Sequence, residues 1–287
     1  HSLIGPEINT VVNAFYFHAL ERMAFLANEL GKEEEGKYIF AKSRQVFDSF
    51  NKQFFDTAKS TYIDGVSIDG TLSDHVSLHA NMFALAFGLV PSERQSSVAD
   101  YVESRGMACS VYGAQYLLEA LFRAGRDEAA LKLMTARGER SWWHMIELGS
   151  TMTLEAWDEK YKPNLTWNHA WGAAPINIVA RYVLGVRPLA PGYTKVLIAP
   201  QPGTLEWAKG SVPTPLGSVE ISFQNTNEFL MEVTVPEGMS VQVVWSRKQD
   251  IAVEVDGIRV ALSQEKTKVV AKNLAKGYHV LKSTSGT

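Results

Sequence analysis

Apolar residues recur at every third or fourth position through the first part of the chain, a spacing typical of helices. The first predicted helix covers residues 10–30, with Asn9 or Thr10 as its N-cap and Gly31 at its end. Its apolar positions surround nearly the whole helix, so we expect it to be buried almost all round. These positions are Val11, Phe15, Ala19, Met23, Leu26 and Leu30, widened by Val12, Phe17, Leu20, Ala24 and Ala27.

Six further helices are predicted, over residues 33–55, 75–87, 92–103, 112–124, 127–137 and 171–184. Odd-numbered helices are followed by short links, whereas long loops follow the even-numbered ones, at residues 56–73, 104–111 and 138–170. Consecutive helices should therefore pair as antiparallel hairpins, and a ring of such hairpins closes into an α/α toroid. We expect the more apolar odd helices inside, and the long loops on the face where those helices begin. Tyr112, Glu155 and His169 fall on that face.

After Gly185 the pattern changes to alternation of apolar and polar residues, which predicts strands. Eight strands are predicted, over residues 195–199, 219–223, 229–235, 241–245, 251–255, 258–262, 268–271 and 278–282. Asp256-Gly257 predicts a two-residue hairpin turn. So many short strands favour a β-sandwich. The fold class is therefore α+β and multidomain, with helical hairpins over residues 1–185 and an antiparallel β-sandwich over residues 186–287.

Composition and charge exclude several classes of partner. Hydrophobic residues are 46% and charged residues 21% of the chain, which is ordinary for a globular protein. The net charge is −3 with no basic block, so nucleic acid and an acidic membrane surface are not expected as partners. No apolar run reaches the roughly 18 residues of a membrane span. The start, HSLIGPEINT, lacks the features of a signal peptide, and the compartment stays open.

Metal and thiol chemistry find little support in the sequence. The histidines are scattered without an HExxH pattern, so no metal or cofactor is expected. The single cysteine, Cys109, cannot form an internal disulfide and is expected to be an inert packed residue. The chain begins without methionine and opens almost at once into a helix, so we expect that residues precede His1 in the parent protein.

The stretch from Ser141 to Gly172 is the chemically richest part of the chain. It holds five of the seven tryptophans, two histidines and four acidic residues. A sugar ring stacks its C–H faces on indole, and a carboxylate near its reacting carbon supplies acid or base. This composition indicates a sugar-binding cleft. The alternative is a buried aromatic cluster with acids at the surface, since large aromatics also dominate ordinary cores.

Several motifs here resemble those of glycoside hydrolase family 78, the bacterial and fungal α-L-rhamnosidases. The run TMTLEAWD at residues 151–158 is similar to the family's T-x-x-x-E-x-W-[DE] segment. Upstream, SWWHMIELG at 141–149 resembles S-W-x-x-M-[IL]-x-x-G, and downstream NHAWG at 168–172 resembles its asparagine–histidine motif. LGVRPL at 184–189 and APQPG at 199–203 also match. The motifs occur in the family's order over more than 60 residues, which makes the signal more specific than any single match.

The resemblance implies an (α/α)6 barrel, of which this chain with its seven predicted helices supplies the C-terminal part. It also implies an inverting hydrolase in which Glu155 is the general base. His169 matches the histidine that hydrogen-bonds the bound sugar, although a core histidine is the alternative. Trp142 matches the family's stacking aromatic. Trp143 stands where the family usually has a small residue, so which of the two rings faces the pocket stays open.

Other candidate residues have more than one interpretation. Trp157 and Trp171 either line the cleft or pack beneath it. Asp158 either orients Glu155, raises its pKa through like charge, or forms a surface salt bridge. His79 is a weaker candidate for the pocket, on the ground that it lies near the start of a helix expected on the inner ring.

One element of the family pattern is absent from the sequence. The family's general acid lies in an acidic motif before the segment seen here, and no counterpart occurs in residues 1–287. We expect that motif in an N-terminal part of the same protein, and the isolated chain to be inactive or nearly so. The expected substrate is a rhamnose-containing glycan or glycoside. The competing interpretations are a non-catalytic carbohydrate-binding module with a Trp-rich groove, and a helical toroid of other purpose, such as a polysaccharide lyase or a scaffold.

Overall fold

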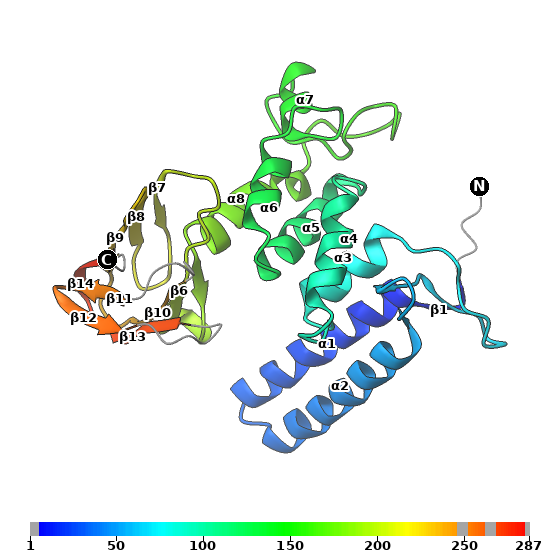
Figure 1. The fold of residues 1–287 in the computed structure, drawn as a ribbon, viewed down its shortest axis with the longest axis horizontal. Coiled ribbons are helices and arrows are strands. Elements are labelled where there is room, and N and C mark those ends of the chain that lie inside the picture. The colour runs from blue at the N-terminus through cyan, green and yellow to red at the C-terminus, as the bar shows by residue number, and fades with distance from the viewer. Residues whose placement is uncertain (1–5, 246–251, 262–267, 285–287) are drawn as a thin grey trace. The chain divides into compact units, whose positions relative to one another are not determined.

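The computed structural model describes residues 6–245, 252–261 and 268–284. The chain divides into two compact units, His1–Gly172 and Ala173–Thr287. The first unit is built from helices and their loops, and the second mainly from strands, as Figure 1 shows. The predicted fold class, helical hairpins followed by a sheet domain, is confirmed.

Six helices of the first unit lie close to their predicted positions. They are α1 (Thr10–Glu29), α2 (Glu33–Gln53), α3 (Leu78–Phe87), α4 (Gln95–Ser104), α5 (Val111–Arg123) and α6 (Asp127–Met134). Three of these helices are capped at their N-terminus by a side chain. Asn9, Ser77 and Ser110 each accept a hydrogen bond from a backbone N–H in the first turn of the helix that follows. Helix α1 packs beside α2 and α3, and α3 packs beside α5, so the odd-numbered helices are neighbours.

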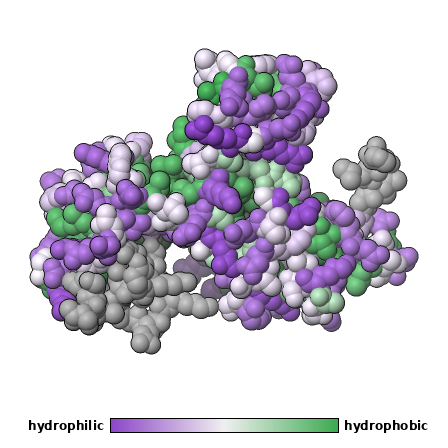
Figure 2. All heavy atoms as spheres, turned by 45° about the horizontal axis from the view of Figure 1, so that its top comes forward, coloured by the Kyte–Doolittle hydropathy of each residue, from purple (hydrophilic) through white to green (hydrophobic). Residues whose placement is uncertain are grey.

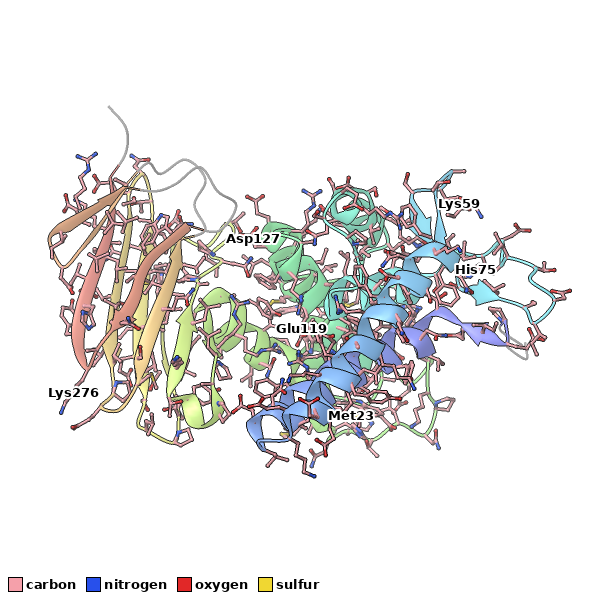
Figure 3. The ribbon with its side chains drawn as sticks, turned by 90° about the horizontal axis from the view of Figure 1, so that it is seen from below. Met23, Lys59, His75, Glu119, Asp127 and Lys276 are labelled. Atoms are coloured by element: carbon pink, nitrogen blue, oxygen red, sulfur yellow. The ribbon has the colours of Figure 1, made fainter. Side chains whose placement is uncertain are left out.

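The prediction that the first helix is buried almost all round is wrong for the described structure. Its buried positions are Thr10, Ala14, Phe17, Leu20, Ala24 and Ala27. Val12 is 65% exposed, Met23 (labelled in Figure 3) 53% and Leu30 72%. The helix has apolar residues on every side, but the rest of the described chain packs against only one side of the helix. A pattern of apolar residues does not tell which of two apolar faces meets a partner.

The loops are more ordered than expected. Residues 56–73 take part in two short antiparallel pairs, β4 (Gly65–Val66) with β1 (Ile8–Asn9) from before the first helix, and β3 (Thr61–Tyr62) with β2 (Phe55–Asp56). The predicted loop at 138–170 contains a short helix, α7 (Trp142–Glu147), which Ser141 caps. The last predicted helix is split into a 3-10 turn η1 (Ala170–Ala173), α8 (Ala174–Ile178) and a π-helical turn η2 (Val179–Val183). Pro175, which has no backbone N–H, stands at the start of α8.

Two sheets and a short 3-10 turn, η3 (Pro191–Tyr193), make up the rest of the second unit. The four-stranded sheet has the order β13-β10-β6-β5, and the six-stranded sheet the order β12-β11-β14-β9-β8-β7. Their strands are β5 (Val186–Pro188), β6 (Lys195–Ile198), β7 (Trp207–Val212), β8 (Val219–Asn225), β9 (Phe229–Val235), β10 (Ser240–Trp245), β11 (Ala252–Val255), β12 (Ile258–Ala261), β13 (Lys268–Leu274) and β14 (Gly277–Thr284).

The eight predicted strands all form, and two more, β5 and β7, were not predicted. Strand β5 is too short for an alternating pattern, and β7 contains Gly210, which weakens the strand signal. One pair, β6 with β10, is parallel, so the sheets are not wholly antiparallel. Phe229 and Trp245, from different sheets, pack edge to face with ring centroids 5.2 Å apart, so apolar faces of the two sheets meet in the core.

The predicted turn at Asp256-Gly257 is confirmed. Val255 pairs with Ile258, and the two turn residues have φ of 51° and 79°, the positive values that a two-residue hairpin of this type needs. The predicted strand ends at Ile251 and Leu262 lie outside the described residues. On the face drawn in Figure 2, polar residues predominate and apolar ones form patches between them. None of the helices in the described part of the chain combines the length and apolar character that a bilayer crossing requires.

Candidate functional site

A pocket of about 600 Å³ opens in the first unit where two helices begin and the long loops converge. His79, in the first turn of α3, and Tyr112, in the first turn of α5, form one part of its wall. Glu155, Trp157 and Trp171, all from the Ser141–Gly172 segment, form another. The volume lies in the range of small-molecule sites. The pocket therefore lies on the face that the loop lengths predicted to be functional.

Glu155 is the one carboxylate among the lining residues, all of which lie in the described part of the chain. Its side chain is 12% exposed and forms an ion pair with Lys162. Its Oε2 accepts a hydrogen bond from the backbone N–H of Thr166 at 3.0 Å. The hydrogen bond from Lys162, followed by that from Thr166, holds the pKa of Glu155 below its usual value against the opposing effect of burial. The carboxyl is therefore ionised at neutral pH.

Two short stretches of the segment run side by side and place Glu155 near His169. The N–H of Glu155 donates to the carbonyl of Thr166 at 3.0 Å, and the N–H of His169 donates to the carbonyl of Thr153 at 2.8 Å. The hydroxyl of Thr153 donates back to the carbonyl of His169 at 2.7 Å. These bonds bring together residues that stand eleven to sixteen positions apart.

His169 reaches Glu155 through one side chain. Its Nδ1 lies 2.8 Å from Oγ1 of Thr166, which in turn lies 3.4 Å from Oε2 of Glu155. The imidazole also packs against Trp171, with ring centroids 4.1 Å apart. The electrostatic interaction with His169 contributes, after larger causes, to the lowered pKa of Glu155. The two residues that the sequence motifs singled out thus belong to one local cluster.

The tryptophans divide between the pocket wall and its support. Trp171 is 42% exposed, and its Nε1 donates to the carbonyl of Glu155 at 3.2 Å. Trp157 is only 2% exposed and donates to the carbonyl of Cys109 at 2.8 Å. Trp142 packs edge to face on Trp157 at 5.1 Å and donates to the carbonyl of Gly172 at 2.7 Å. Trp142 is not among the lining residues of the described pocket, so it supports the wall from behind.

Trp143 and Asp158 are engaged elsewhere than with Glu155. Trp143 donates from Nε1 to Glu147 at 2.7 Å, and Arg137 lies over its ring at 4.2 Å. Asp158 forms a pair with Nε2 of His144 at 2.7 Å. The observed contact of Asp158 is therefore this hydrogen bond with His144, and no contact joins its side chain to Glu155 in the described structure. It does not raise the pKa of Glu155, which is lowered.

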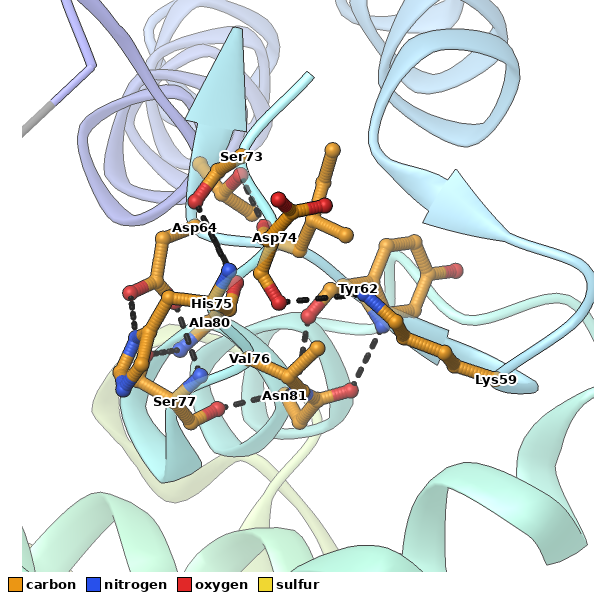
Figure 4. Close-up of polar contacts among 12 residues, drawn as sticks. Lys59, Tyr62, Asp64, Ser73, Asp74, His75, Val76, Ser77, Ala80 and Asn81 are labelled. Atoms are coloured by element: carbon orange, nitrogen blue, oxygen red, sulfur yellow. Dashed lines mark hydrogen bonds and ion pairs between the residues drawn. The ribbon is translucent and has the colours of Figure 1, made fainter.

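A polar frame holds the start of α3, which carries His79. Asp64 accepts from the backbone N–H of Ser77 at 2.8 Å and pairs with Nδ1 of His75 at 2.5 Å (Figure 4). Buried Asn81 accepts from the N–H of Tyr62 at 2.8 Å and donates to its carbonyl at 2.9 Å. Burial lowers the pKa of His79, with Asp64 acting in the opposite direction. His79 is therefore a neutral imidazole at neutral pH.

Cys109 lines the pocket but is not reactive. It is buried, and burial raises the pKa of its thiol to about 12, although Arg140 acts in the opposite direction. A thiol is a poor nucleophile when it is not ionised. Its backbone matters more, because its carbonyl holds Trp157.

Sequence reasoning missed four polar lining residues: Ser110, Arg140, Tyr161 and Lys162. Lys162 stands seven positions after Glu155, a spacing that carries no signal in an irregular segment. Arg140 and Tyr161 lie 21 positions apart yet stack, with Cζ 4.9 Å from the ring centroid. Within the described residues, no group of three or more histidine, cysteine, aspartate or glutamate side chains is arranged to hold a metal ion.

The first unit thus consists of helical hairpins with an aromatic pocket around an ionised carboxylate. Residues 5–183 match the family model of the bacterial alpha-L-rhamnosidase 6 hairpin glycosidase domain, and residues 185–259 that of the bacterial alpha-L-rhamnosidase C-terminal domain. The chain belongs to the bacterial α-L-rhamnosidase family. The resemblance found in the sequence motifs is confirmed.

Individual relatives agree with this assignment. The chain is 27% identical over 258 residues to an alpha-L-rhamnosidase of Alteromonas sp. (strain LOR), covering 83% of this chain and 26% of that protein. It is 28% identical over 272 residues to an alpha-L-rhamnosidase of Formosa agariphila, covering 89% and 27%. The structure of alpha-L-rhamnosidase from Dictyoglumus thermophilum has the same fold, with a TM-score of 0.78 at 23% identity, covering 94% and 31%. The chain thus spans about a quarter of the length of these two curated relatives.

Proposed function

We propose that the chain is part of an enzyme that hydrolyses terminal α-L-rhamnosides by inversion, and that Glu155 is its general base. The observation that carries this proposal is an ionised carboxylate in an aromatic pocket, in a chain of the α-L-rhamnosidase family. The catalytic portion is proposed to include residues 1–185, and the β-sandwich residues 186–287. The residues matched by the family's hairpin domain end at 183.

In the proposed reaction a water molecule sits between Glu155 and the anomeric carbon of the rhamnose. Glu155 takes a proton from this water as its oxygen attacks, and the bond from the anomeric carbon to the leaving oxygen breaks. The general acid that protonates the leaving oxygen is proposed to lie in a part of the parent protein outside this chain. Inverting pairs stand about 6.5–9.5 Å apart, which leaves room for the water.

The surroundings of Glu155 suit a base that must be ionised before substrate arrives. Its lowered pKa keeps the carboxylate form at neutral pH, at some cost in basicity. Because Nδ1 of His169 faces Thr166, its Nε2 is the ring nitrogen that we assign to a sugar hydroxyl. Trp171 and Tyr112, with ring centroids 5.3 Å apart, offer aromatic surface to the C–H face of the sugar.

The test is to replace Glu155 in the parent protein and follow hydrolysis of 4-nitrophenyl α-L-rhamnopyranoside. E155Q should lower kcat by roughly 10²–10⁴-fold, the usual contribution of a general base. The matched control is E159Q, which changes an exposed carboxylate four positions on and should keep most of the activity. Proton NMR should show β-L-rhamnose as the first product. Full activity of E155Q, or α-L-rhamnose as the first product, would contradict the mechanism.

The alternative function, a non-catalytic carbohydrate-binding module, predicts a different result in the same experiment. It would give no turnover in the parent protein and would keep its affinity for L-rhamnose in E155Q. The isolated 287-residue chain is expected to show little or no turnover, and substantial turnover by it alone would refute the placement of the general acid.

A further inference from the structure

Thr166 contacts both Glu155 and His169, and the reaction proposed above gives it no role. Its backbone N–H donates to Oε2 of Glu155 at 3.0 Å, and its carbonyl accepts from the N–H of Glu155 at 3.0 Å. Its hydroxyl oxygen lies 3.4 Å from Oε2 of Glu155 and 2.8 Å from Nδ1 of His169. All of these contacts lie within the chain itself, so they do not depend on which other parts of the parent protein border the pocket.

The backbone of His169 is fixed by neighbouring bonds, but its ring is not. The N–H of His169 donates to the carbonyl of Thr153 at 2.8 Å, and its carbonyl accepts from the hydroxyl of Thr153 at 2.7 Å. A half turn of the ring about its Cβ–Cγ bond would place carbon atoms where the two nitrogens lie. The contact with Trp171, at 4.1 Å between ring centroids, restricts the plane of the ring in either position. It does not select between the two.

The hydroxyl of Thr166 does select one of them, because a ring nitrogen can form a hydrogen bond with it and a ring carbon cannot. A hydroxyl has one proton and two lone pairs, so it can donate to Nδ1 or accept from Nδ1–H. In either case Nδ1 is held at Thr166, and Nε2 is the nitrogen that is left for the sugar. The branched Cβ of threonine restricts the rotation of this hydroxyl. The two backbone bonds with Glu155 fix the place of Thr166 relative to the carboxylate.

We propose that Thr166 is a positioning residue for the hydrolysis, and that its hydroxyl holds the imidazole of His169 in the orientation that presents Nε2 to the sugar. The inference rests on the proposed function and adds the residue that holds the sugar-binding imidazole and the base as one unit. Thr166 acts through His169 and needs no contact with the sugar. Loss of the hydroxyl should weaken sugar binding, while Lys162 and the backbone N–H of Thr166 still hold the carboxylate.

The test is hydrolysis of 4-nitrophenyl α-L-rhamnopyranoside by the parent protein with Thr166 replaced. T166V keeps the branched shape without the hydroxyl. It should raise KM about five- to tenfold, as expected for the loss of one hydrogen bond, and change kcat by less than about twofold. The inhibition constant of L-rhamnose should rise by the same factor. T166S keeps the hydroxyl and should restore most of the affinity. T57V is the matched control, since it makes the same change at a threonine outside the Ser141–Gly172 segment and should alter neither constant.

A double-mutant cycle assigns the effect to the imidazole. H169A should raise KM at least as much as T166V does. Adding T166V to H169A should then change KM by less than about twofold, because the hydroxyl has no ring left to orient. A purely structural role of Thr166 would make the two effects additive. T166A and T166S form a second pair that differs by the hydroxyl alone, so T166A should reproduce the rise in KM even if valine fits poorly at this position.

A wild-type KM in both T166V and T166A would overturn the inference. So would an equal effect of T166V in the presence and in the absence of the imidazole. Either result would leave Glu155 as the base, because the loss of turnover in E155Q is measured independently of Thr166. Full activity of E155Q would instead contradict the proposed function, and with it the role of Thr166.

Discussion

The Ser141–Gly172 segment and the six-stranded sheet reach order by different means. In the sheet, strands β7, β8, β9 and β14 exchange backbone hydrogen bonds through regular registers, such as Ile221 with Val233. In the segment, much of the backbone is held by side chains. Trp142, Trp157 and Thr153 each donate to a backbone carbonyl distant in sequence, at 2.7, 2.8 and 2.7 Å.

The difference explains why the candidate site lies where it does. A ladder of backbone bonds tolerates many side chains, since its bonds do not depend on them. A segment held by side chains can place a carboxylate, an imidazole and an indole at any mutual geometry, but each bond depends on one residue. We therefore expect substitutions in the segment to act through tertiary packing, and those in the sheet through local backbone conformation.

The largest expected effect on stability is that of Gly172→Ala. A Cβ on Gly172 would lie 2.6 Å from Cβ of Thr153 and 3.1 Å from the carbonyl oxygen of Leu154, so the two stretches that hold His169 and Glu155 must separate. Overpacking of this kind costs about 1–3 kcal/mol. The change in the free energy of unfolding is measured by urea denaturation, monitored by tryptophan fluorescence, because five of the seven tryptophans lie in this segment.

The control for that experiment is Gly138→Ala, three residues before the segment. No atom lies within 4 Å of a Cβ on Gly138, and its backbone is not in the left-handed region. Its stability should change by less than about 1 kcal/mol. Equal destabilisation by both substitutions would mean that the segment is not held by the close approach of Gly172 to Thr153.

A smaller effect is expected for Gly257→Ala in the hairpin turn between β11 and β12. Nothing lies within 4 Å of a Cβ there, but φ is 79°, so the cost is one of backbone conformation alone, roughly 1–2 kcal/mol. Gly257→Asn should cost less, because asparagine tolerates the left-handed region. Hydrogen exchange of the backbone amides in residues 252–261 measures the loss of stability of this hairpin. Similar exchange in both variants would show that the turn does not control this part of the sheet.

The smallest effect on stability is expected for Lys162→Met. This substitution is the most informative about the catalytic role of Glu155. The hydrogen bond from Lys162 is the largest cause of the lowered pKa of Glu155, so its removal lets that pKa rise toward the usual value. The acid limb of the pH dependence of kcat/KM should move to higher pH in the parent protein, because the base is protonated sooner as pH falls.

Lys160→Met provides the comparison for that profile. It removes a lysine of the same loop whose partner is Glu139, outside the pocket lining, and should leave the acid limb in place. If the acid limb stays in place in K162M, or moves to lower pH, then the group that titrates in this limb is not Glu155.

Much of the fold could be predicted because local patterns carry it. The spacing of apolar residues predicted the first six helices of the first unit but not α7, and alternation predicted eight of the ten strands found in the described residues of the second. The Asp256-Gly257 turn followed from its two residues alone. The exposure of α1 could not be predicted, since Met23 and Leu26 are apolar yet face away from the packed side. The short β5 and the glycine-containing β7 lacked a pattern long enough to detect.

The candidate site was predicted in part, through motifs rather than through periodicity. Glu155 and His169 were identified by resemblance, and they lie in one cluster joined by Thr166. The distinction between Trp171 at the pocket wall and Trp142 behind it depends on which atoms approach which. The same holds for Asp158, whose partner proved to be His144.

By itself, the sequence determined most of the helices and longer strands, the face on which the long loops gather and the identity of the carboxylate to examine. These properties depend on residues close together along the chain or on short motifs. Only the tertiary structure decided that Lys162 neutralises Glu155, that Thr166 joins Glu155 to His169, and which indole is exposed. Contacts of this kind join residues across irregular loops, where no repeating backbone geometry links a position in the sequence to a direction in space.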